Sequence, residues 1–446
     1  MRFGTDGIRG SANDELTPDL AVRLGRAAGA VLGASTFVVG RDTRQSGPML
    51  EAALVAGLCS AGASVELLGV VPTPAVASVA ARRGVGGAMI SASHNAFGDN
   101  GIKLFAPGGL KLNDEVQDRI EELLHRPSGS VSEATVPVGS DVGTVIQGGP
   151  EDVAAYLDSI VGVLEGRRLD GLSVVLDCAN GSNSDHASAV FESLGAAVTT
   201  LHHRPNGRNI NEGCGSNHPE DLVAEVLRRG ADLGFAFDGD ADRLVAVTGS
   251  GVIVDGDQLI ALSALDLRAR GRLVEDTIVV TVMSNLGLLR AMERAGITVR
   301  QTAVGDRYVL EELCSGGFSL GGEQSGHLIF RGHSTTGDGL LCAVFMSDLV
   351  VRRGQSLGVL AADVMVRLPQ VLRAVRLEAR PPVMADLMDR LAPVVAQAEE
   401  ELGARGRVLL RPSGTEPVIR VMVEADVETV AAEIAERLVS AVRSLT

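Results

Sequence analysis

The sequence has few aromatic residues: tryptophan is absent, and phenylalanine and tyrosine together make up only 3% of 446 residues. Proteins that bind single-stranded nucleic acid stack bases on aromatic side chains and follow the phosphate backbone with clustered cations. Here the formal net charge is −16, and no run of basic residues offsets it. The composition therefore argues against nucleic acid as a partner, and binding of small anions would depend on local groups of arginines.

Cysteine is sparse, and long apolar runs are missing. The five thiols are odd in number and never spaced as a Cys-x-x-Cys pair: Cys59, Cys178, Cys214, Cys314 and Cys342. This scatter is typical of reduced, buried thiols and fits disulfides or a zinc motif less well. No stretch approaches the roughly 20 consecutive apolar residues of a membrane helix. We therefore expect a cytoplasmic protein without a membrane partner.

Length and the alternation of strand and helix patterns predict several domains. A chain of 446 residues is too long for one hydrophobic core. Helices are expected at 47–62, 114–125, 150–164, 219–229, 285–295, 305–314 and 382–402, and three more are expected to begin near residues 18, 257 and 427. Strands are expected at 37–40, 65–71, 87–90, 173–176, 197–201, 277–283, 407–410 and 418–424. We predict three successive α/β domains at 1–148, 149–247 and 248–364, followed by a smaller α+β domain at 365–446.

Three aspartates, Asp238, Asp240 and Asp242, alternate directly after the apolar run 233–237. In extended chain, alternate side chains point to the same side, where the carboxylates would repel one another without a cation between them. Oxygen ligands favour a hard ion, and magnesium leaves coordination positions for a substrate phosphate or water. An EF-hand calcium loop does not fit, because its sixth and twelfth positions would be Arg and Gly. A solvated acidic turn is the alternative, but so apolar a strand disfavours it.

A second polar loop, Ser91-Ala92-Ser93-His94-Asn95, follows the strand predicted at 87–90. Alone, these residues would indicate only a turn. Lys103 follows shortly after and supplies a cation, and a magnesium site needs an anionic partner. A serine that carries a phosphoryl group beside the metal would be a phosphoryl donor and, once emptied, an acceptor.

The segment 411–417 reads Arg-Pro-Ser-Gly-Thr-Glu-Pro and combines a guanidinium, two hydroxyls and a glycine. These groups can form a phosphate cradle, although a hairpin turn between two strands is an equally simple explanation, and both can hold. A second arginine, Arg420, favours phosphate binding. Near the N-terminus, Arg9 lies between glycines in a segment that is either a capping loop or a further phosphate contact.

A glycine-rich loop at 321–327 offers Glu323, Ser325 and His327 at alternate positions. An acceptor, a hydroxyl and a titratable imidazole facing one ligand would suit the hydroxyl groups of a sugar ring. A structural role is the alternative for His327, but the three spaced polar groups favour function.

With these loops in order, the chain resembles the α-D-phosphohexomutase superfamily and, within it, the bacterial phosphoglucosamine mutase group. The resemblance spans essentially the whole length: segments 91–95, 238–243, 321–327 and 411–417 occur in family order, and 3–10 and 303–308 also look like this family. It implies mixed sheets in four domains around a central cleft. Gln324 resembles the glucosamine enzymes, whereas phosphomannomutase/phosphoglucomutase relatives more often have Met there. Ala96 is a departure, because family members often have Pro after Ser-His-Asn.

The resemblance also implies a role for each residue that matches a family motif. Ser93 would be the phosphoserine, and its phosphate would hold one Mg²⁺ per chain together with Asp238, Asp240 and Asp242. Glu323 and Ser325 would read the sugar, and the clamp on its distal phosphate would comprise Arg411, Ser413, Gly414, Thr415 and Arg420. Lys103 and His327 are candidate acid/base groups, while Arg9 and Arg243 would lie beside the transferring phosphate.

The reaction implied by the resemblance is interconversion of glucosamine 6-phosphate and glucosamine 1-phosphate, which feeds UDP-N-acetylglucosamine and peptidoglycan precursor synthesis. Glucosamine or glucose 1,6-bisphosphate would be the intermediate and primer. Three alternatives stay open: a mutase for glucose or mannose phosphates, a metal-dependent sugar phosphatase, and a sugar-phosphate binding or sensing protein. Two phosphate-binding loops argue against a phosphatase, which needs one. A homodimer, and a phosphoryl donor or kinase for Ser93, are further expectations.

Overall fold

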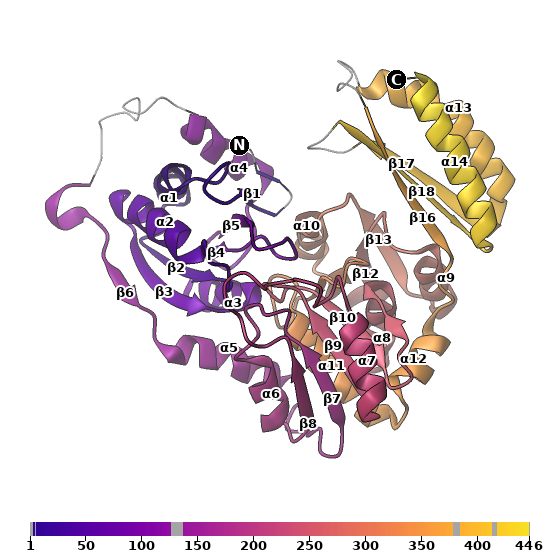
Figure 1. Ribbon diagram of the computed structural model, residues 1–446, viewed down its shortest axis with the longest axis horizontal. Coiled ribbons are helices and arrows are strands. Elements are labelled where there is room, and N and C mark those ends of the chain that lie inside the picture. The colour runs from indigo at the N-terminus through magenta and orange to yellow at the C-terminus, as the bar shows by residue number, and fades with distance from the viewer. Residues whose placement is uncertain (1–2, 5, 126–136, 378–383, 413–416, 446) are drawn as a thin grey trace. The chain divides into compact units, whose positions relative to one another are not determined.

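The computed structural model describes residues 3–4, 6–125, 137–377, 384–412 and 417–445 (Figure 1). The chain divides into two compact units. The first comprises Met1–Met283 and Ile297–Asp363, and the second comprises Ser284–Gly296 and Val364–Thr446. Among the described residues, no helix has both the length and the apolar character needed to cross a membrane.

The first unit begins with a six-stranded mixed sheet in the order β1-β5-β4-β2-β3-β6. Its strands are β1 (Ile8–Ser11), β2 (Thr36–Arg41), β3 (Ser64–Val70), β4 (Gly86–Ile90), β5 (Asp99–Phe105) and β6 (Val145–Gln147), and its helices are α1 (Pro18–Leu32), α2 (Gly47–Ser60), α3 (Thr73–Arg83) and α4 (Asp114–His125). Strand β4 lies inside the sheet and is buried along its length. The loop that follows β4 therefore starts from a rigid position.

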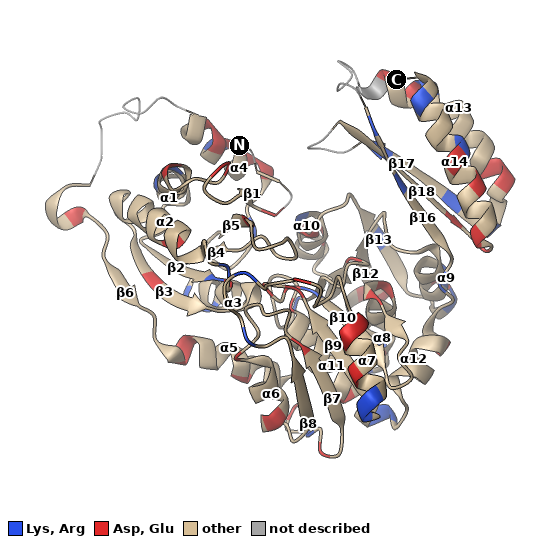
Figure 2. Cartoon of the chain, viewed as in Figure 1, with Lys and Arg blue, Asp and Glu red and all other residues tan. Residues whose placement is uncertain are grey.

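A five-stranded sheet follows in the order β11-β10-β9-β7-β8. It contains β7 (Ser173–Asp177), β8 (Ala197–Leu201), β9 (Leu233–Phe237), β10 (Leu244–Thr248) and β11 (Ile253–Val254), with helices α5 (Pro150–Gly162), α6 (Ala187–Ser193) and α7 (Glu220–Arg229). Helix α7 begins with acidic residues and ends with arginines (Figure 2), as the helix dipole favours. Strand β9 is fully buried and pairs antiparallel with β10, so that residues 238–243 form the connection of a hairpin.

The third sheet has the order β13-β12-β14-β15. Its strands are β12 (Thr277–Thr281), β13 (Thr298–Thr302), β14 (Leu320–Gly322) and β15 (Leu328–Phe330), and the neighbouring helices are α8 (Gly256–Ala269), α10 (Asp306–Gly316), α11 (Gly339–Arg353) and α12 (Leu357–Val364). Strands β14 and β15 are antiparallel, and residues 323–327 connect them. The second and third sheets thus each present one polar loop at the tip of a hairpin.

The second unit is built on the antiparallel strands β16 (Gln370–Arg376), β17 (Gly406–Pro412) and β18 (Val418–Ala425), in the order β16-β18-β17. It also contains helices α9 (Leu286–Ala295), α13 (Met384–Leu402) and α14 (Glu428–Leu445). Helix α9 is attached to it by the Leu286 N–H, which donates to the Glu424 carboxylate at 3.1 Å. Three mixed α/β sheets and a smaller α+β part confirm the predicted fold class. The predicted four-domain boundaries stay a prediction.

Candidate active site

Ser93 lies in the loop after β4 in a left-handed conformation, with φ at +53°, and it is fully buried. Its N–H donates to Ser91 Oγ at 2.9 Å, and the Ser91 hydroxyl donates to Asp42 Oδ2 at 2.6 Å. Positive φ is costly for serine and persists only where the surrounding structure imposes it, as at many functional sites. Holding Ser93 in this conformation therefore lowers the stability of the folded protein locally, and the surrounding contacts must offset that cost.

Two planar donors hold the carbonyl groups of residues 91–95, which we call the serine loop. One donor lies after β2 and the other between β8 and α7. Arg44, whose side chain is fully buried, donates to the carbonyls of Ser93 at 3.0 Å and of Asn95 at 2.9 Å. Asn211 Nδ2 donates to the same two carbonyls at 2.8 and 2.9 Å. Neither residue was predicted from the sequence. For Arg44, the polar segment 41–44, which contains three charged residues directly after a predicted strand, is the signal that could have indicated it.

The Ser93 hydroxyl reaches residues 238–243, which we call the metal loop, because its Oγ donates to Asp238 Oδ2 at 2.5 Å. The carboxylates of Asp238, Asp240 and Asp242 are buried, and one oxygen from each lies within 4.8 Å of the others. They converge through a tight turn in which Ala241 has φ at +59°. The expectation that alternation in extended chain aligns them is therefore wrong in its geometry, although the three side chains do meet.

The charge state of these carboxylates fits a divalent cation. Burial, followed by the charges of Asp242 and Asp240, raises the pKa of Asp238 to about 8. Within the described part of the chain, Asp240 Oδ1 and Asp242 Oδ1 accept no hydrogen bond although both are buried. Buried carboxylate oxygens without a donor are costly, and a hard cation with oxygen ligands would satisfy them. The donor set therefore suits a metal ion of this class.

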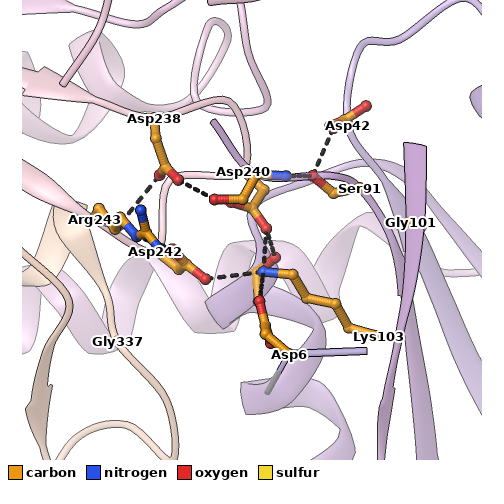
Figure 3. A network of polar contacts seen from close by, with 12 residues as sticks. Asp6, Asp42, Ser91, Gly101, Lys103, Asp238, Asp240, Asp242, Arg243 and Gly337 are labelled. Carbon is orange, nitrogen blue, oxygen red and sulfur yellow. Dashed lines mark hydrogen bonds and ion pairs between the residues drawn. The ribbon is translucent and has the colours of Figure 1, made fainter. Parts of the chain in front are cut away.

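Lys103, on β5, lies among three carboxylates (Figure 3). Its Nζ is 2.7 Å from Asp240 Oδ2, 3.0 Å from Asp242 Oδ2 and 2.7 Å from Asp6 Oδ2. Burial alone would lower the pKa of Lys103, but the neighbouring Asp240, Asp242 and Asp6 hold it well above its ordinary value. In this arrangement Lys103 neutralises the metal loop and keeps its proton.

The metal loop belongs to a closed ring of acidic and basic side chains within the first unit. Around the ring, each member contacts the next: Asp242, Lys103, Asp6, Lys111, Asp306 and His327. His327 closes it, with Nδ1 3.6 Å from Asp242 Oδ1. The Gly337 N–H donates to His327 Nε2 at 2.9 Å, which assigns the lone pair to Nε2 and the proton to Nδ1. His327 is thus aimed at the metal loop.

His94 contacts the Ser93 hydroxyl and links it to Arg243. His94 Nδ1 is 3.2 Å from Ser93 Oγ and 3.0 Å from Arg243 Nη1. Burial, followed by the charges of Arg243 and Arg9, lowers the pKa of His94 to about 4, so the imidazole is neutral near pH 7. Arg9 pairs with Asp6 at 2.7 Å. The sequence analysis predicted Arg9 and Arg243 beside the reacting phosphate, but it missed His94 and Asp6.

The loop between β14 and β15 holds its three polar side chains at different depths. Its residues form a turn in which Ser325 is exposed and His327 is buried. Glu323 is half-buried and accepts the Gly305 N–H at 3.2 Å, and burial, followed by Asp306, raises its pKa. A turn therefore replaces the extended chain on which the expectation of alignment was based, and a shared role for Glu323, Ser325 and His327 stays a prediction.

In the second unit, Arg411 and Arg420 lie directly opposite each other on β17 and β18. Like charges at facing positions of an antiparallel pair destabilise the sheet, and a bound anion would offset that repulsion. The structure thus brings together the two arginines predicted to bind phosphate. Ser413, Gly414 and Thr415, predicted to share that role, lie outside the described residues.

Comparisons with known proteins identify the family to which the chain belongs. Sequence models of the phosphoglucomutase/phosphomannomutase family match as α/β/α domain I at 1–129, domain II at 154–251, domain III at 255–368 and the C-terminal domain at 369–441. The chain is 52% identical to a phosphoglucosamine mutase of Frankia alni over 99% of this chain and 98% of that one. It is 51% identical to that of Rhodococcus opacus, over 99% of both chains.

Solved structures extend the agreement. A phosphoglucomutase/phosphomannomutase family protein of Burkholderia thailandensis has a TM-score of 0.80 at 26% identity, over 99% of this chain and 97% of that one. An N-acetylphosphoglucosamine mutase of Aspergillus fumigatus, solved with GlcNAc-6P and magnesium, shares the fold at 17% identity, with a TM-score of 0.69 over 100% and 96% of the two chains. The chain therefore belongs to the phosphoglucomutase/phosphomannomutase family and, within it, to the phosphoglucosamine mutases.

Proposed function

We propose that this chain interconverts glucosamine 6-phosphate and glucosamine 1-phosphate, with Ser93 as the phosphoryl carrier. The observation that carries the proposal is the 2.5 Å contact between Ser93 Oγ and Asp238 Oδ2 inside a triad of buried aspartates. A hydroxyl held in a strained backbone beside a cation site can be phosphorylated and can return the phosphoryl group.

Mg²⁺ would be held by Asp238, Asp240 and Asp242 together with the serine phosphate, and it would neutralise the phosphate oxygens during transfer. The chain's own contribution is positioning and charge. Arg44 and Asn211 fix the serine loop through its carbonyls. Arg9 and Arg243 would face the remaining phosphate oxygens.

In the first transfer, the bond from phosphorus to Ser93 Oγ breaks while a bond from phosphorus to the sugar's free hydroxyl oxygen forms. The sugar hydroxyl gives up its proton, and Ser93 Oγ takes one up. The sugar hydroxyl can supply the proton that Ser93 Oγ takes up. In the reverse transfer, His94, neutral near pH 7 and with Nδ1 3.2 Å from Ser93 Oγ, can accept the proton of the serine hydroxyl. Lys103 and His327 remain our other acid/base candidates.

The product of the first transfer is a sugar 1,6-bisphosphate. It has to turn over so that its other phosphate faces Ser93, and the reverse transfer then leaves the isomeric monophosphate and restores the phosphoserine. In this scheme Glu323 and Ser325 read the sugar hydroxyls, while Arg411, Arg420 and residues 413–415 bind a substrate phosphate. A trace of bisphosphate or a separate phosphoryl donor would charge Ser93 initially.

The substrate is tested by measuring kcat/KM for glucosamine, glucose and mannose phosphates side by side, with magnesium and a trace of glucose 1,6-bisphosphate. We expect a preference for glucosamine of about a hundredfold, which corresponds to roughly 2.7 kcal/mol of transition-state discrimination. Equal rates, or a preference for glucose or mannose, would keep the mutase mechanism and reject this substrate. Inorganic phosphate that accumulates as substrate disappears would identify a phosphatase instead.

A further inference from the structure

A second group of metal-ligating side chains lies in the sheet that carries the metal loop, separate from the aspartate triad. Asp177 ends β7, His202 directly follows β8 and Cys214 lies in the loop before α7 (Figure 1). One oxygen, nitrogen and sulfur atom of these three residues lie within 4.8 Å of one another. Asp177 and Cys214 are buried, whereas the His202 side chain is 25% exposed. The three ligand atoms are therefore close together, and solvent reaches the cluster at His202.

The atoms have the spacing of ligands around one small cation. His202 Nδ1 is 3.1 Å from Asp177 Oδ1, and it has no hydrogen-bond partner within the described part of the chain. Bonds of about 2.0 to 2.1 Å in a tetrahedral zinc site put nitrogen and oxygen ligands about 3.3 Å apart. The 3.1 Å separation of His202 Nδ1 and Asp177 Oδ1 is close to that value.

Each of the three side chains also has the supporting partner expected of a metal ligand. The Asp177 carboxylate accepts the N–H groups of Ala179 and Gly215, both at 2.9 Å. His202 Nε2 faces Asp221 Oδ2 at 3.3 Å, the carboxylate–histidine arrangement that orients a ligating imidazole. Asn180 Nδ2 lies 4.0 Å from Cys214 Sγ, which accepts its hydrogen bond.

The donor set defines the ion. Sulfur and imidazole ligands select zinc and similar soft divalent ions, whereas magnesium prefers oxygen. We propose that Asp177, His202 and Cys214 form a site for a divalent cation of the zinc class, with water in the fourth position. On binding, the thiol proton leaves to solvent. Burial, followed by the charges of Asp177 and Asp221, raises the pKa of Cys214 to about 12, and the cation offsets this cost.

The site is connected to the Ser93 loop by the segment that contains Cys214. Asn211, in the same segment, donates to the carbonyls of Ser93 and Asn95, and its own N–H donates to the Ala179 carbonyl at 3.0 Å. The Ser216 N–H donates to the carbonyl of Phe237, next to the metal loop, at 2.8 Å. An ion bound at Cys214 would therefore fasten the segment that positions the phosphoryl carrier.

Cobalt(II) is the probe, because a thiolate ligand gives it a near-ultraviolet charge-transfer band that oxygen ligands do not give. The protein is titrated with Co²⁺ under excess Mg²⁺, which occupies the aspartate triad. We expect a thiolate band that saturates at one Co²⁺ per chain and is displaced by Zn²⁺. Cys314→Ser is the matched control, since this partly exposed thiol is remote in sequence from the cluster, and it should leave the band unchanged.

Two variants test the ligands independently. Cys214→Ser should abolish the band. His202→Gly should weaken Co²⁺ binding at least about tenfold while the protein still folds, because His202 has φ at +44° and glycine accepts that conformation readily. Circular dichroism and the unfolding transition check folding. Absence of a band in the wild-type protein, a band that survives Cys214→Ser, or unchanged affinity in folded His202→Gly would overturn the proposal.

Discussion

Ser93 Oγ and Asp238 Oδ2 lie 2.5 Å apart although 145 residues separate them in the sequence. This contact joins the loop after β4 to the hairpin between β9 and β10. The same Asp238 has its pKa raised to about 8 by burial and by its two neighbouring aspartates. Ser93, the proposed phosphoryl carrier, and the carboxylate of the metal loop whose pKa is raised to about 8 are therefore direct partners.

Metal removal should make stability depend on pH. Because the pKa of Asp238 is about 8 in the folded protein and ordinarily 3.8, the folded metal-free protein keeps a proton that the unfolded chain has released. The contribution of Asp238 is fully present below about pH 4 and is lost as pH rises toward about 8. Thermal unfolding in EDTA should therefore show a falling midpoint across this range, and added Mg²⁺ should restore it, most strongly near pH 8.

Asp238→Asn is the matched control for that experiment, because an amide keeps the shape and has no proton to lose. The unfolding midpoint of this variant should fall less with rising pH than that of the wild-type protein. Added Mg²⁺ should also raise the midpoint of the variant much less. If the unfolding midpoint changed with pH by the same amount in the wild-type protein and in Asp238→Asn, Asp238 would not be the titrating group.

Asn211→Gly should slow turnover without removing any reacting group. Asn211 has φ at +57°, so glycine preserves the backbone while deleting the hydrogen bonds to the carbonyls of Ser93 and Asn95. We expect a loss of stability of about 1 to 3 kcal/mol and a fall in kcat of about tenfold, with a smaller change in KM. Steady-state kinetics and denaturant unfolding measure both. A changed KM with normal kcat would place Asn211 in substrate binding instead.

Arg411→Ala should weaken substrate binding while leaving metal binding intact. Loss of a charge-assisted contact to phosphate should raise KM about 10- to 100-fold, or roughly 1.4 to 2.7 kcal/mol. Arg373→Ala is the control, since this exposed arginine on β16 pairs with Glu436 at 2.8 Å. An equal rise in KM in both variants, or a loss of Mg²⁺ affinity in Arg411→Ala of the same size as its rise in KM, would show that Arg411 does not bind the substrate phosphate.

The candidate reactive groups could be recognised in the sequence because each occurs as a compact motif after a strand. The aspartate triad and Ser93 needed only local spacing, yet the reason given for convergence was incomplete, since Ala241 bends the chain where extended backbone was expected. Arg44, Asn211 and His94 were missed because their importance lies in contacts between distant segments. No local sequence pattern predicts such long-range contacts.

Some elements were missed for similarly physical reasons. Helix α11 is buried along most of its length, so it lacks the one-sided apolar period that identifies surface helices. Strand β5 contains Asn100-Gly101, which typically indicates a turn, but its residues pair with β1 and β4. The cluster of Asp177, His202 and Cys214 is also invisible to spacing rules, because three loops contribute one ligand each.

The most direct test of the account is a single-turnover measurement of phosphoryl transfer from Ser93. Enzyme charged with radiolabelled phosphate is mixed with glucosamine 6-phosphate and Mg²⁺, and the label is followed in protein and sugar. We predict that the label leaves Ser93 for sugar bisphosphate and monophosphate at a rate no slower than kcat, and that Ser93→Ala takes up no label and loses at least about a thousandfold in kcat. Near-normal turnover by folded Ser93→Ala, or label released only as inorganic phosphate, would contradict the mechanism.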